Sequence, residues 1–238
     1  MAKRRGKLYI IPSSLGTKSL KDELNEKDIE IVKSLKYFVV ETPKVARRHL
    51  RDLDLNLRKL HFDILDEHTK YKDIPSLLDP IYEGHNIGLL SDAGCPGVAD
   101  PGSPLVLAAH RHNIHVIPLV GPSSIVLALM GSGLNGQKFS FEGYLPRKRD
   151  KRAERVKILE SLSKRFGETQ IFIEAPYRNM HLYRDILNHC EPTTLLCIAS
   201  NLTKRKEFIK TQTIREWQTT KTPSINKVPT IFLISAKK

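Results

Sequence analysis

The sequence predicts an α/β protein made of two α/β domains. Its 238 residues suffice for one large domain or two of about 120 residues each. In the first half, short apolar runs alternate with segments of helical periodicity, as in a parallel sheet with helices on its faces. The second half begins a new set of strands and helices, and its later strands look antiparallel. We therefore expect a mostly parallel domain over residues 1–120 and a mixed domain over residues 121–238, with the boundary near Val120.

Each strand of the first half is expected at a short run of apolar residues that ends in a turn. The expected strands are 8–11, 37–40, 87–90 and 114–119, with a further one within 57–65, and the expected helices are 24–35, 44–51, 74–83 and 103–109. Ser103 and Pro104 have the residue types of an N-cap and a first helical residue.

The second half continues the alternation. A helix is expected over 125–130, followed by a strand at 139–141, a basic helix over 150–163, a strand at 169–173, a helix over 178–188, a strand at 194–199, a hairpin-like segment over 208–214 and a strand at 230–234. Only residues 219–227 have the composition of a linker.

The net charge of +13 is unevenly distributed. Residues 1–120 contain 18 Lys and Arg against 16 Asp and Glu, whereas the remaining residues contain 21 against 10. A field of that sign concentrates anionic partners, of which nucleic acid is the commonest. The alternative is that the excess charge serves solubility alone.

The sequence gives no support for a membrane, secreted, disulfide-bonded or zinc-binding protein. No apolar run approaches the roughly 20 residues that cross a bilayer, and no signal-peptide core follows the basic start. Cys95, Cys190 and Cys197 have neither disulfide nor zinc-ligand spacing. We expect a cytoplasmic protein that binds no metal and no membrane.

The stretch from Ile87 to Ser124 is the most informative part of the chain. Its first strand ends at Ser91 in a loop whose glycines and prolines expose backbone amides and carbonyls to a ligand. The loop contains Asp92 and Asp100, which favour a ligand that is cationic or rich in hydroxyls and amines. No glycine-rich phosphate-binding motif occurs.

Several motifs of this stretch and beyond have a recognisable order. They are S-D-A-G-C-P at 91–96, D-P-G at 100–102, G-P-S-S at 121–124, S-G-L at 132–134 and F-E-G-Y-L-P at 141–146. Over nearly the whole chain the sequence resembles the tetrapyrrole methylase superfamily, most closely the branch that 2'-O-methylates a cytidine of 16S ribosomal RNA.

The resemblance implies a two-domain methyltransferase, commonly a homodimer, that binds S-adenosyl-L-methionine in a cleft between its domains. The positions that would contact this cofactor are Pro12, Ser13 and Gly16; Ser91, Asp92, Ala93, Gly94 and Pro96; Asp100, Pro101 and Gly102; Gly121, Pro122, Ser123 and Ser124; Ile173 and Ala175; and Asn201, Leu202 and Thr203. Carboxylates beside a sulfonium are electrostatically favourable, although capping of the loop is the alternative role of Asp92.

The chain departs from the branch pattern in both halves. In the first half, T-P-I-G-N is S-S-L-G-T at 13–17 and E-D-T-R is E-T-P-K at 41–44. The pattern Y-E-S-P-H-R is I-E-A-P-Y-R at 173–178, R-E-L-T-K is S-N-L-T-K at 200–204, and a G-E pair before the last strand is replaced by Val228-Pro229. The motifs expected to bind the cofactor therefore match the branch pattern more closely than those expected to bind the methyl acceptor. This difference is typical of a diverged paralogue that methylates another molecule.

Methyl transfer to a ribose hydroxyl needs in-line positioning and can use a general base. The candidate bases are Glu174 and Asp100; their alternative roles are an ion pair with Arg178 and stabilisation of a turn. The basic run 147–152 can bind RNA phosphates, with Tyr144 stacking on a base. A solvated basic helix is the alternative. The predicted RNA-binding residues are Lys148, Arg149, Arg152, Arg178 and Lys204.

Three functions remain open from the sequence. The first is methylation of ribosomal RNA with S-adenosylmethionine. The second keeps the cofactor but transfers the methyl group to a tetrapyrrole-like or other small molecule. The third is a non-catalytic RNA-binding paralogue that has kept only the fold.

Overall fold

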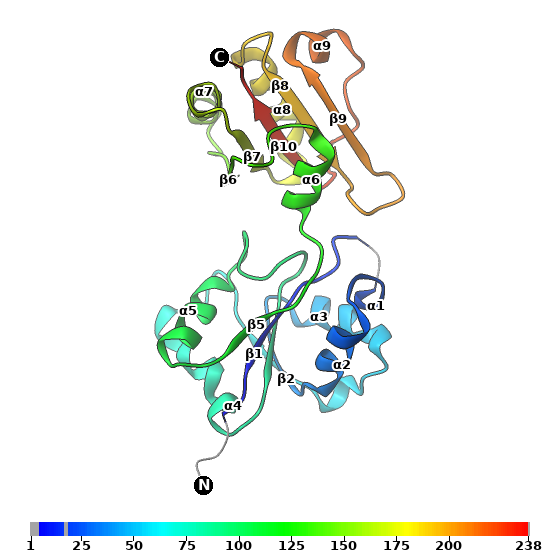
Figure 1. Ribbon diagram of the computed structural model, residues 1–238, viewed down its shortest axis with the longest axis vertical. Coiled ribbons are helices and arrows are strands. Elements are labelled where there is room, and N and C mark those ends of the chain that lie inside the picture. The colour runs from blue at the N-terminus through cyan, green and yellow to red at the C-terminus, as the bar shows by residue number, and fades with distance from the viewer. Residues whose placement is uncertain (1–4, 17–18, 238) are drawn as a thin grey trace. The chain divides into compact units, whose positions relative to one another are not determined.

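The chain forms two compact units, Met1–Ser123 and Ser124–Lys238, each with its own sheet (Figure 1). The computed structural model describes residues 5–16 and 19–237. Both units are α/β, and the second sheet is mixed, so the predicted fold class is confirmed.

The first unit contains a five-stranded parallel sheet in the order β3-β2-β4-β1-β5. Its strands are β1 (Leu8–Ile11), β2 (Tyr37–Val40), β3 (His61–Ile64), β4 (Ile87–Leu90) and β5 (Val116–Pro118). Its α-helices are α1 (Leu20–Glu23), α2 (Glu26–Ser34), α3 (Pro43–Leu50), α4 (Asp79–Tyr82) and α5 (Ser103–Arg111). Because all strands are parallel, the loops that follow them emerge at one edge of the sheet.

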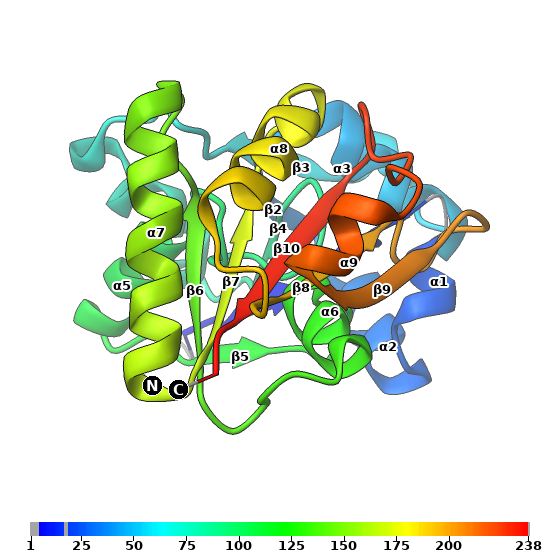
Figure 2. The same cartoon turned by 90° about the horizontal axis from the view of Figure 1, so that it is seen from above.

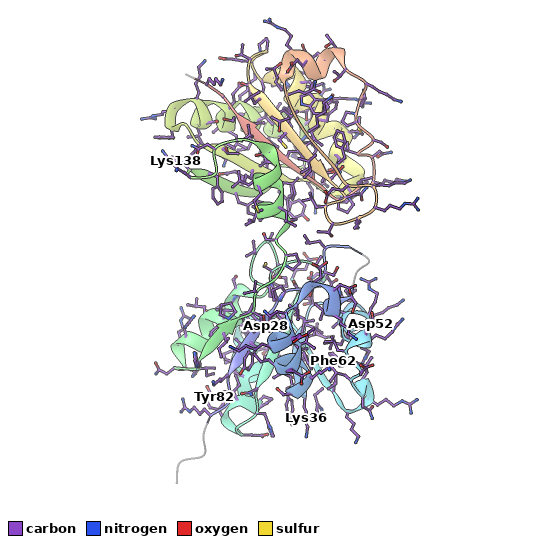
Figure 3. The ribbon with its side chains drawn as sticks, turned by 45° about the vertical axis from the view of Figure 1, so that its right-hand side comes forward. Asp28, Lys36, Asp52, Phe62, Tyr82 and Lys138 are labelled. Carbon is purple, nitrogen blue, oxygen red and sulfur yellow. The ribbon has the colours of Figure 1, made fainter. Side chains whose placement is uncertain are left out.

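Alternating residues of these strands fill two cores, one on each face of the sheet. Leu8, Ile10 and Leu89 pack with residues of α4 and α5, whereas Tyr9, Ile11 and their neighbours pack with α1, α2 and α3. The edge strand β3 is more open: Phe62, labelled in Figure 3, stacks on Phe38, and the Arg47 guanidinium lies 4.8 Å from the centre of its ring. The continuous apolar runs of β1 and β4 follow from burial on both faces.

The second unit contains a sheet in the order β6-β7-β10-β8-β9. Its strands are β6 (Phe139–Tyr144), β7 (Thr169–Ile173), β8 (Leu195–Ser200), β9 (Phe208–Thr213) and β10 (Thr230–Ser235), and its α-helices are α6 (Ser124–Ser132), α7 (Arg149–Phe166), α8 (Asn179–His189) and α9 (Ile214–Thr219). Only the β6 and β7 pair is parallel; β10 and β9 run antiparallel to their neighbours. The prediction that the later strands are antiparallel is therefore confirmed.

Two cores again lie on opposite faces. Figure 2 shows α7 and α8 on the same side of β7 and β10, where Phe172 and Phe232 pack with residues of both helices and of α9. Residues of α6 pack on the other face, against Ile171, Ala199 and Leu233. The helix α7 ends at Gly167, whose φ is 66°, and Lys138, labelled in Figure 3, donates to the Phe166 carbonyl at 3.0 Å.

Two local expectations are wrong, and the helix α9 was not expected. The expected strand within 57–65 is confirmed at His61–Ile64, after a 3-10 turn at Leu57–Lys59. The segment 74–83 is divided between a 3-10 helix (Pro75–Leu78) and α4. Ser103 was expected to be the N-cap of the helix, but the N-cap of α5 is Gly102, and Ser103 is the first helical residue. The hairpin-like segment 208–214 is confirmed as β9, which pairs antiparallel with β8. Thr213 and Glu216 then form a capping box that begins α9.

No helix within residues 5–16 and 19–237 is both long enough and apolar enough to span a membrane.

Candidate active site

The loops after β1 and β4 are joined at the carboxyl edge of the first sheet. These strands are neighbours, so their ends meet. Ser13 and Gly94 exchange two backbone hydrogen bonds of 2.7 and 3.0 Å, and the buried Ser13 hydroxyl donates to the Ser91 carbonyl at 2.7 Å. Gly94 has a φ of 78°, which favours glycine at this bend. The sequence-predicted residues Pro12, Ser13, Ser91, Ala93 and Gly94 thus belong to one assembly of loops.

Asp92 is held by the loop and helix that follow β2. The Thr42 hydroxyl donates to Asp92 Oδ2 at 2.8 Å, and His49 Nε2 donates to the Asp92 carbonyl at 3.0 Å. Both partners precede or belong to α3. The carboxylate of this partly buried residue is therefore oriented by its neighbours.

Asp100 organises the second half of the same loop. Its Oδ1 accepts backbone hydrogen bonds from Gly97 at 2.5 Å and Gly102 at 2.8 Å. Its Oδ2 is buried without a hydrogen-bond partner among the described residues. A buried carboxylate oxygen without a partner is costly, so this atom indicates a place where a ligand donor or a water molecule binds.

The loop after β5 packs directly on the loop after β1. A Cβ atom added to Gly121 would lie 2.3 Å from the Pro12 Cβ, so only glycine allows this approach. Pro122 accepts a hydrogen bond from the Cys95 thiol at 3.4 Å. Burial, with the nearby Asp100 carboxylate, raises the pKa of that thiol, which keeps it protonated. Of the predicted G-P-S-S segment, Ser123 ends the first unit and Ser124 begins α6.

Glu41 is the functional candidate that the sequence interpretation missed. It follows β2 directly, and burial, then the negative charges of Asp92, Asp100 and Asp66, raise its pKa above the ordinary 4.5. Glu41, Ser91 and Asp100 border a hollow of about 10 Å³, room for about one water molecule. The sequence signals for Glu41 were its position at the end of a parallel strand and its match to the first residue of the branch pattern E-D-T-R.

Three carboxylates therefore gather around sharply bent backbone: Glu41, Asp92 and Asp100. Mutual repulsion of these groups decreases when a cation binds beside them. Their oxygens also accept hydrogen bonds from hydroxyls and amines. Among the described residues, no group of His, Cys, Asp and Glu has the arrangement of a metal site.

In the second unit, the predicted site residues meet at one end of the sheet. Ile173 at the end of β7 pairs with Ile231 of β10, and Ser200 at the end of β8 pairs with Thr230. The buried Asn179 side chain donates to Val228 at 2.6 Å and to Ile225 at 3.1 Å, which ties the start of α8 to the segment before β10. The segments 173–179 and 200–204, which are distant in the sequence, are thereby placed at the same end of the sheet.

Glu174 and Arg178 form an ion pair at this end. Glu174 Oε1 accepts from Arg178 Nη2 at 2.5 Å and from the Ala175 amide at 2.7 Å. Glu174 is 4% exposed, and its Oε2 has no partner in the described chain. The hydrogen bond to Glu174 raises the pKa of the Arg178 guanidinium, so Arg178 is charged. The ion pair was the alternative role for Glu174, and it leaves one buried carboxylate oxygen without a partner among the described residues.

The 200–204 segment is a tight turn. Asn201 and Thr203 both have positive φ values, 51° and 65°. Leu202 is buried in the core, and the Thr203 amide donates to Glu207 at 2.7 Å. The Thr203 hydroxyl is buried without a partner among described residues, while Lys204 is half-buried.

The basic residues at the start of α7 differ in exposure. Lys148 is exposed, and 76% of the Arg149 side chain is exposed. Arg152 is buried: its guanidinium contacts Asp185 at 2.7 Å and donates to the Arg147 carbonyl at 3.1 Å. Arg155 pairs with Glu142. Exposure thus suits Lys148 and Arg149 to a partner, whereas the contacts of Arg152 hold α7 to α8.

Comparisons with known proteins agree with this arrangement. A family model described as Tetrapyrrole (Corrin/Porphyrin) Methylases matches residues 10–218. Ribosomal RNA small subunit methyltransferase I of Escherichia coli O157:H7 is 30% identical over 205 residues, covering 86% of this chain and 68% of that protein. The protein of the same name from Streptococcus pyogenes serotype M6 is 32% identical over 214 residues, covering 90% and 71%.

Solved structures share the fold. A crystal structure of the methyltransferase CobJ superposes with a TM-score of 0.64 at 18% identity, covering 97% of this chain and 94% of that one. For uroporphyrin-III-C-methyltransferase from Thermus thermophilus the TM-score is 0.55 at 19% identity, with 97% and 92% covered.

The chain has a parallel sheet with sharply bent loops at its carboxyl edge, followed by a mixed sheet. It resembles the proteins above along most of its length. Together these findings define a methyltransferase of the two-domain α/β class. The chain belongs to the tetrapyrrole methylase family.

Proposed function

We propose that this protein transfers the methyl group of S-adenosyl-L-methionine to a ribose 2'-hydroxyl of ribosomal RNA. The observation that carries the proposal is the cluster of Glu41, Asp92 and Asp100 around the joined loops of the first sheet. The names of the relatives and the excess of Lys and Arg in the second half support an RNA acceptor.

The residues present fit this cofactor. S-adenosylmethionine supplies a methyl group on a positively charged sulfur atom. The carboxylates of the first unit stabilise a positive charge, and the carboxylate of Asp92 and the buried Oδ2 of Asp100 can accept from ribose hydroxyls or the amino group. The family resemblance also predicts contacts from the backbone of Ile173 and Ala175 and from the turn of Asn201, Leu202 and Thr203.

Glu174 is the residue we assign to proton removal. Its Oε1 accepts from Arg178 and from the Ala175 amide, while Oε2, buried without a partner among the described residues, can accept the proton of the attacking hydroxyl. Asp100, the other candidate, already binds two backbone amides. Its role is to hold the cofactor loop in place.

Two measurements on the whole chain test the proposal. Titration calorimetry with S-adenosylmethionine tests the cofactor, and transfer of a labelled methyl group to small-subunit ribosomal RNA, followed by nucleoside analysis, tests the acceptor. The expected product is a 2'-O-methyl nucleoside. Transfer only to a tetrapyrrole would support a small-molecule acceptor, and RNA binding without cofactor binding would support a non-catalytic paralogue.

Replacing Glu41 by Gln should weaken the affinity for S-adenosylmethionine by about three- to tenfold, because a carboxylate near the sulfonium is lost. The affinity for the uncharged thioether S-adenosylhomocysteine should change less. Because the pKa of Glu41 is raised, the wild-type affinity for the sulfonium should increase as pH rises through that pKa. Calorimetry over a pH series measures both effects.

The same variant has a predicted effect on stability. The folded chain holds the Glu41 proton more tightly than the unfolded chain, so wild-type stability decreases as pH rises from 4.5 through the raised pKa. Glu41→Gln removes that decrease and should raise the melting temperature at pH 7. Glu83→Gln, an exposed position of the same unit, is the control.

In the binding experiment, an equal loss of affinity for S-adenosylmethionine and S-adenosylhomocysteine in Glu41→Gln would contradict a specific role for the Glu41 charge.

We further propose that the protein acts as a homodimer, as the family resemblance implies, and that it acts in the cytoplasm. Light scattering coupled to size exclusion measures the oligomeric state, and a mass of 27.1 kDa would identify a monomer.

A further inference from the structure

A cavity of about 400 Å³ opens in the second unit between the start of α7 and the helix α8. This volume exceeds that of a single ion and lies in the range of small-ligand sites. The cavity is lined mainly by cationic side chains, which are Arg147, Arg149, Arg152, Arg178, Arg184 and, when protonated, His181.

The cavity wall has a large excess of positive charge. Asp185 is the single carboxylate among its lining residues, against five guanidinium groups. Asp185 is already paired with Arg152 at 2.7 Å, and Arg149 approaches it only to 3.8 Å. The charges of Arg147 and Arg184 therefore have no compensating carboxylate in the lining. An anion that enters the cavity reduces this repulsion.

Two of the side chains that line the cavity are buried and paired with each other. The side chains of Arg152 and Asp185 are each 4% exposed, and Arg152 also donates to the Arg147 carbonyl at 3.1 Å. These contacts fix the start of α7 relative to α8, so the backbone positions of the lining arginines are set before a ligand arrives. A preformed site binds with a lower entropic cost.

Arg178 connects the cavity to Glu174. Its Nη2 donates to Glu174 Oε1 and its Nη1 to the Tyr177 hydroxyl at 3.0 Å, while its Nε is buried without a partner in the described chain. The same guanidinium that lines the cavity thus holds the proposed general base. A group bound in the cavity is placed one side chain away from Glu174.

We propose that this cavity binds a backbone phosphate of the RNA acceptor, near the nucleotide to be methylated. This inference rests on the proposed function. Guanidinium groups offer paired donors that match phosphate oxygens, and the volume admits a phosphate with part of its sugar. The site adds Arg147 and Arg184 to the RNA-binding residues and assigns Arg152 the positioning of the cavity wall.

The test compares two double variants with equal loss of charge. Arg147→Gln/Arg184→Gln removes two exposed lining residues but leaves the Arg152 and Asp185 pair intact. Lys157→Gln/Lys221→Gln removes two exposed lysines of the second unit that lie outside the basic run 147–152 and do not line the cavity. Affinity for a hairpin of small-subunit ribosomal RNA is measured over a salt series, and the effect of pyrophosphate on the melting temperature is measured without RNA.

The cavity variant should lose about tenfold in RNA affinity, with a salt dependence shallower by about one unit of slope. The lysine variant should change less than about threefold. Pyrophosphate should stabilise the wild type and the lysine variant but not the cavity variant, and all three proteins should bind S-adenosylhomocysteine equally.

The other outcomes overturn the inference in distinguishable ways. Equal losses in both variants would show general attraction by the basic surface. Loss of the pyrophosphate effect with unchanged RNA affinity would indicate a site for a free phosphate compound. If wild-type protein binds the cofactor but no RNA, the acceptor proposal fails, and the backbone phosphate assignment fails with it.

Discussion

Replacing Arg152 by Met is expected to lower the free energy of unfolding of the second unit by about 3–5 kcal/mol. The change leaves Asp185, which is 3% exposed, as a buried carboxylate without its main partner. It also removes the hydrogen bond to the Arg147 carbonyl, which joins the start of α7 to this pair. Urea denaturation of the whole chain, followed by the fluorescence of Trp217 in the second core, measures the loss.

Two further variants separate the buried pair from general charge effects. Arg149→Met, at a side chain that is 76% exposed, should cost less than about 1 kcal/mol. The double change Arg152→Met/Asp185→Leu should recover most of the stability, because neither buried charge remains. A loss below about 1 kcal/mol for Arg152→Met would contradict the structural role of this residue.

The largest effect on activity is expected from Glu174→Gln, which should lower kcat about 10²- to 10⁴-fold. The amide oxygen of Gln can still accept from Arg178 and from the Ala175 amide, so the loop is retained. The variant loses a carboxylate oxygen that can take up a proton. Single-turnover methyl transfer to ribosomal RNA at saturating cofactor measures the change.

Two controls distinguish loss of the general base from loss of cofactor binding and from a nonspecific effect on activity. Affinity for S-adenosylhomocysteine should stay within about twofold of wild type, and Glu154→Gln, at an exposed site on α7, should leave kcat unchanged. A decrease of less than about threefold in Glu174→Gln would exclude Glu174 as the base. Asp100→Asn would then be the next variant to measure.

Periodicity and turn residues predicted most of the fold. Continuous apolar runs such as Leu8–Ile11 and Ile87–Leu90 are buried on both faces of a parallel sheet, and their patterns depend on no distant contact. The helix α9 was missed because its start depends on the reciprocal hydrogen bonds of Thr213 and Glu216, and six residues carry little periodicity. Strand order was beyond prediction because it is set by long-range packing.

The candidate site was predicted unevenly for a physical reason. The loop residues from Ser91 to Gly102 are consecutive and carry their own signal of bent backbone. Glu41 is brought toward Asp92 and Asp100 only because β2 lies beside β4 in the sheet. Arg152 was placed on an RNA-binding surface because it stands in a basic run, yet Arg152, Val156, Leu159 and Ser163 share the inward face of α7.

The chain order of the two sheets has a consequence for biosynthesis. Every strand of the first sheet lies before residue 119, and every strand of the second lies after residue 138, within the residues that the structure describes. Neither sheet contains a strand from the other half of the chain. As the polypeptide leaves the ribosome, the amino-terminal unit can therefore acquire its complete core while the carboxyl-terminal unit is still being translated.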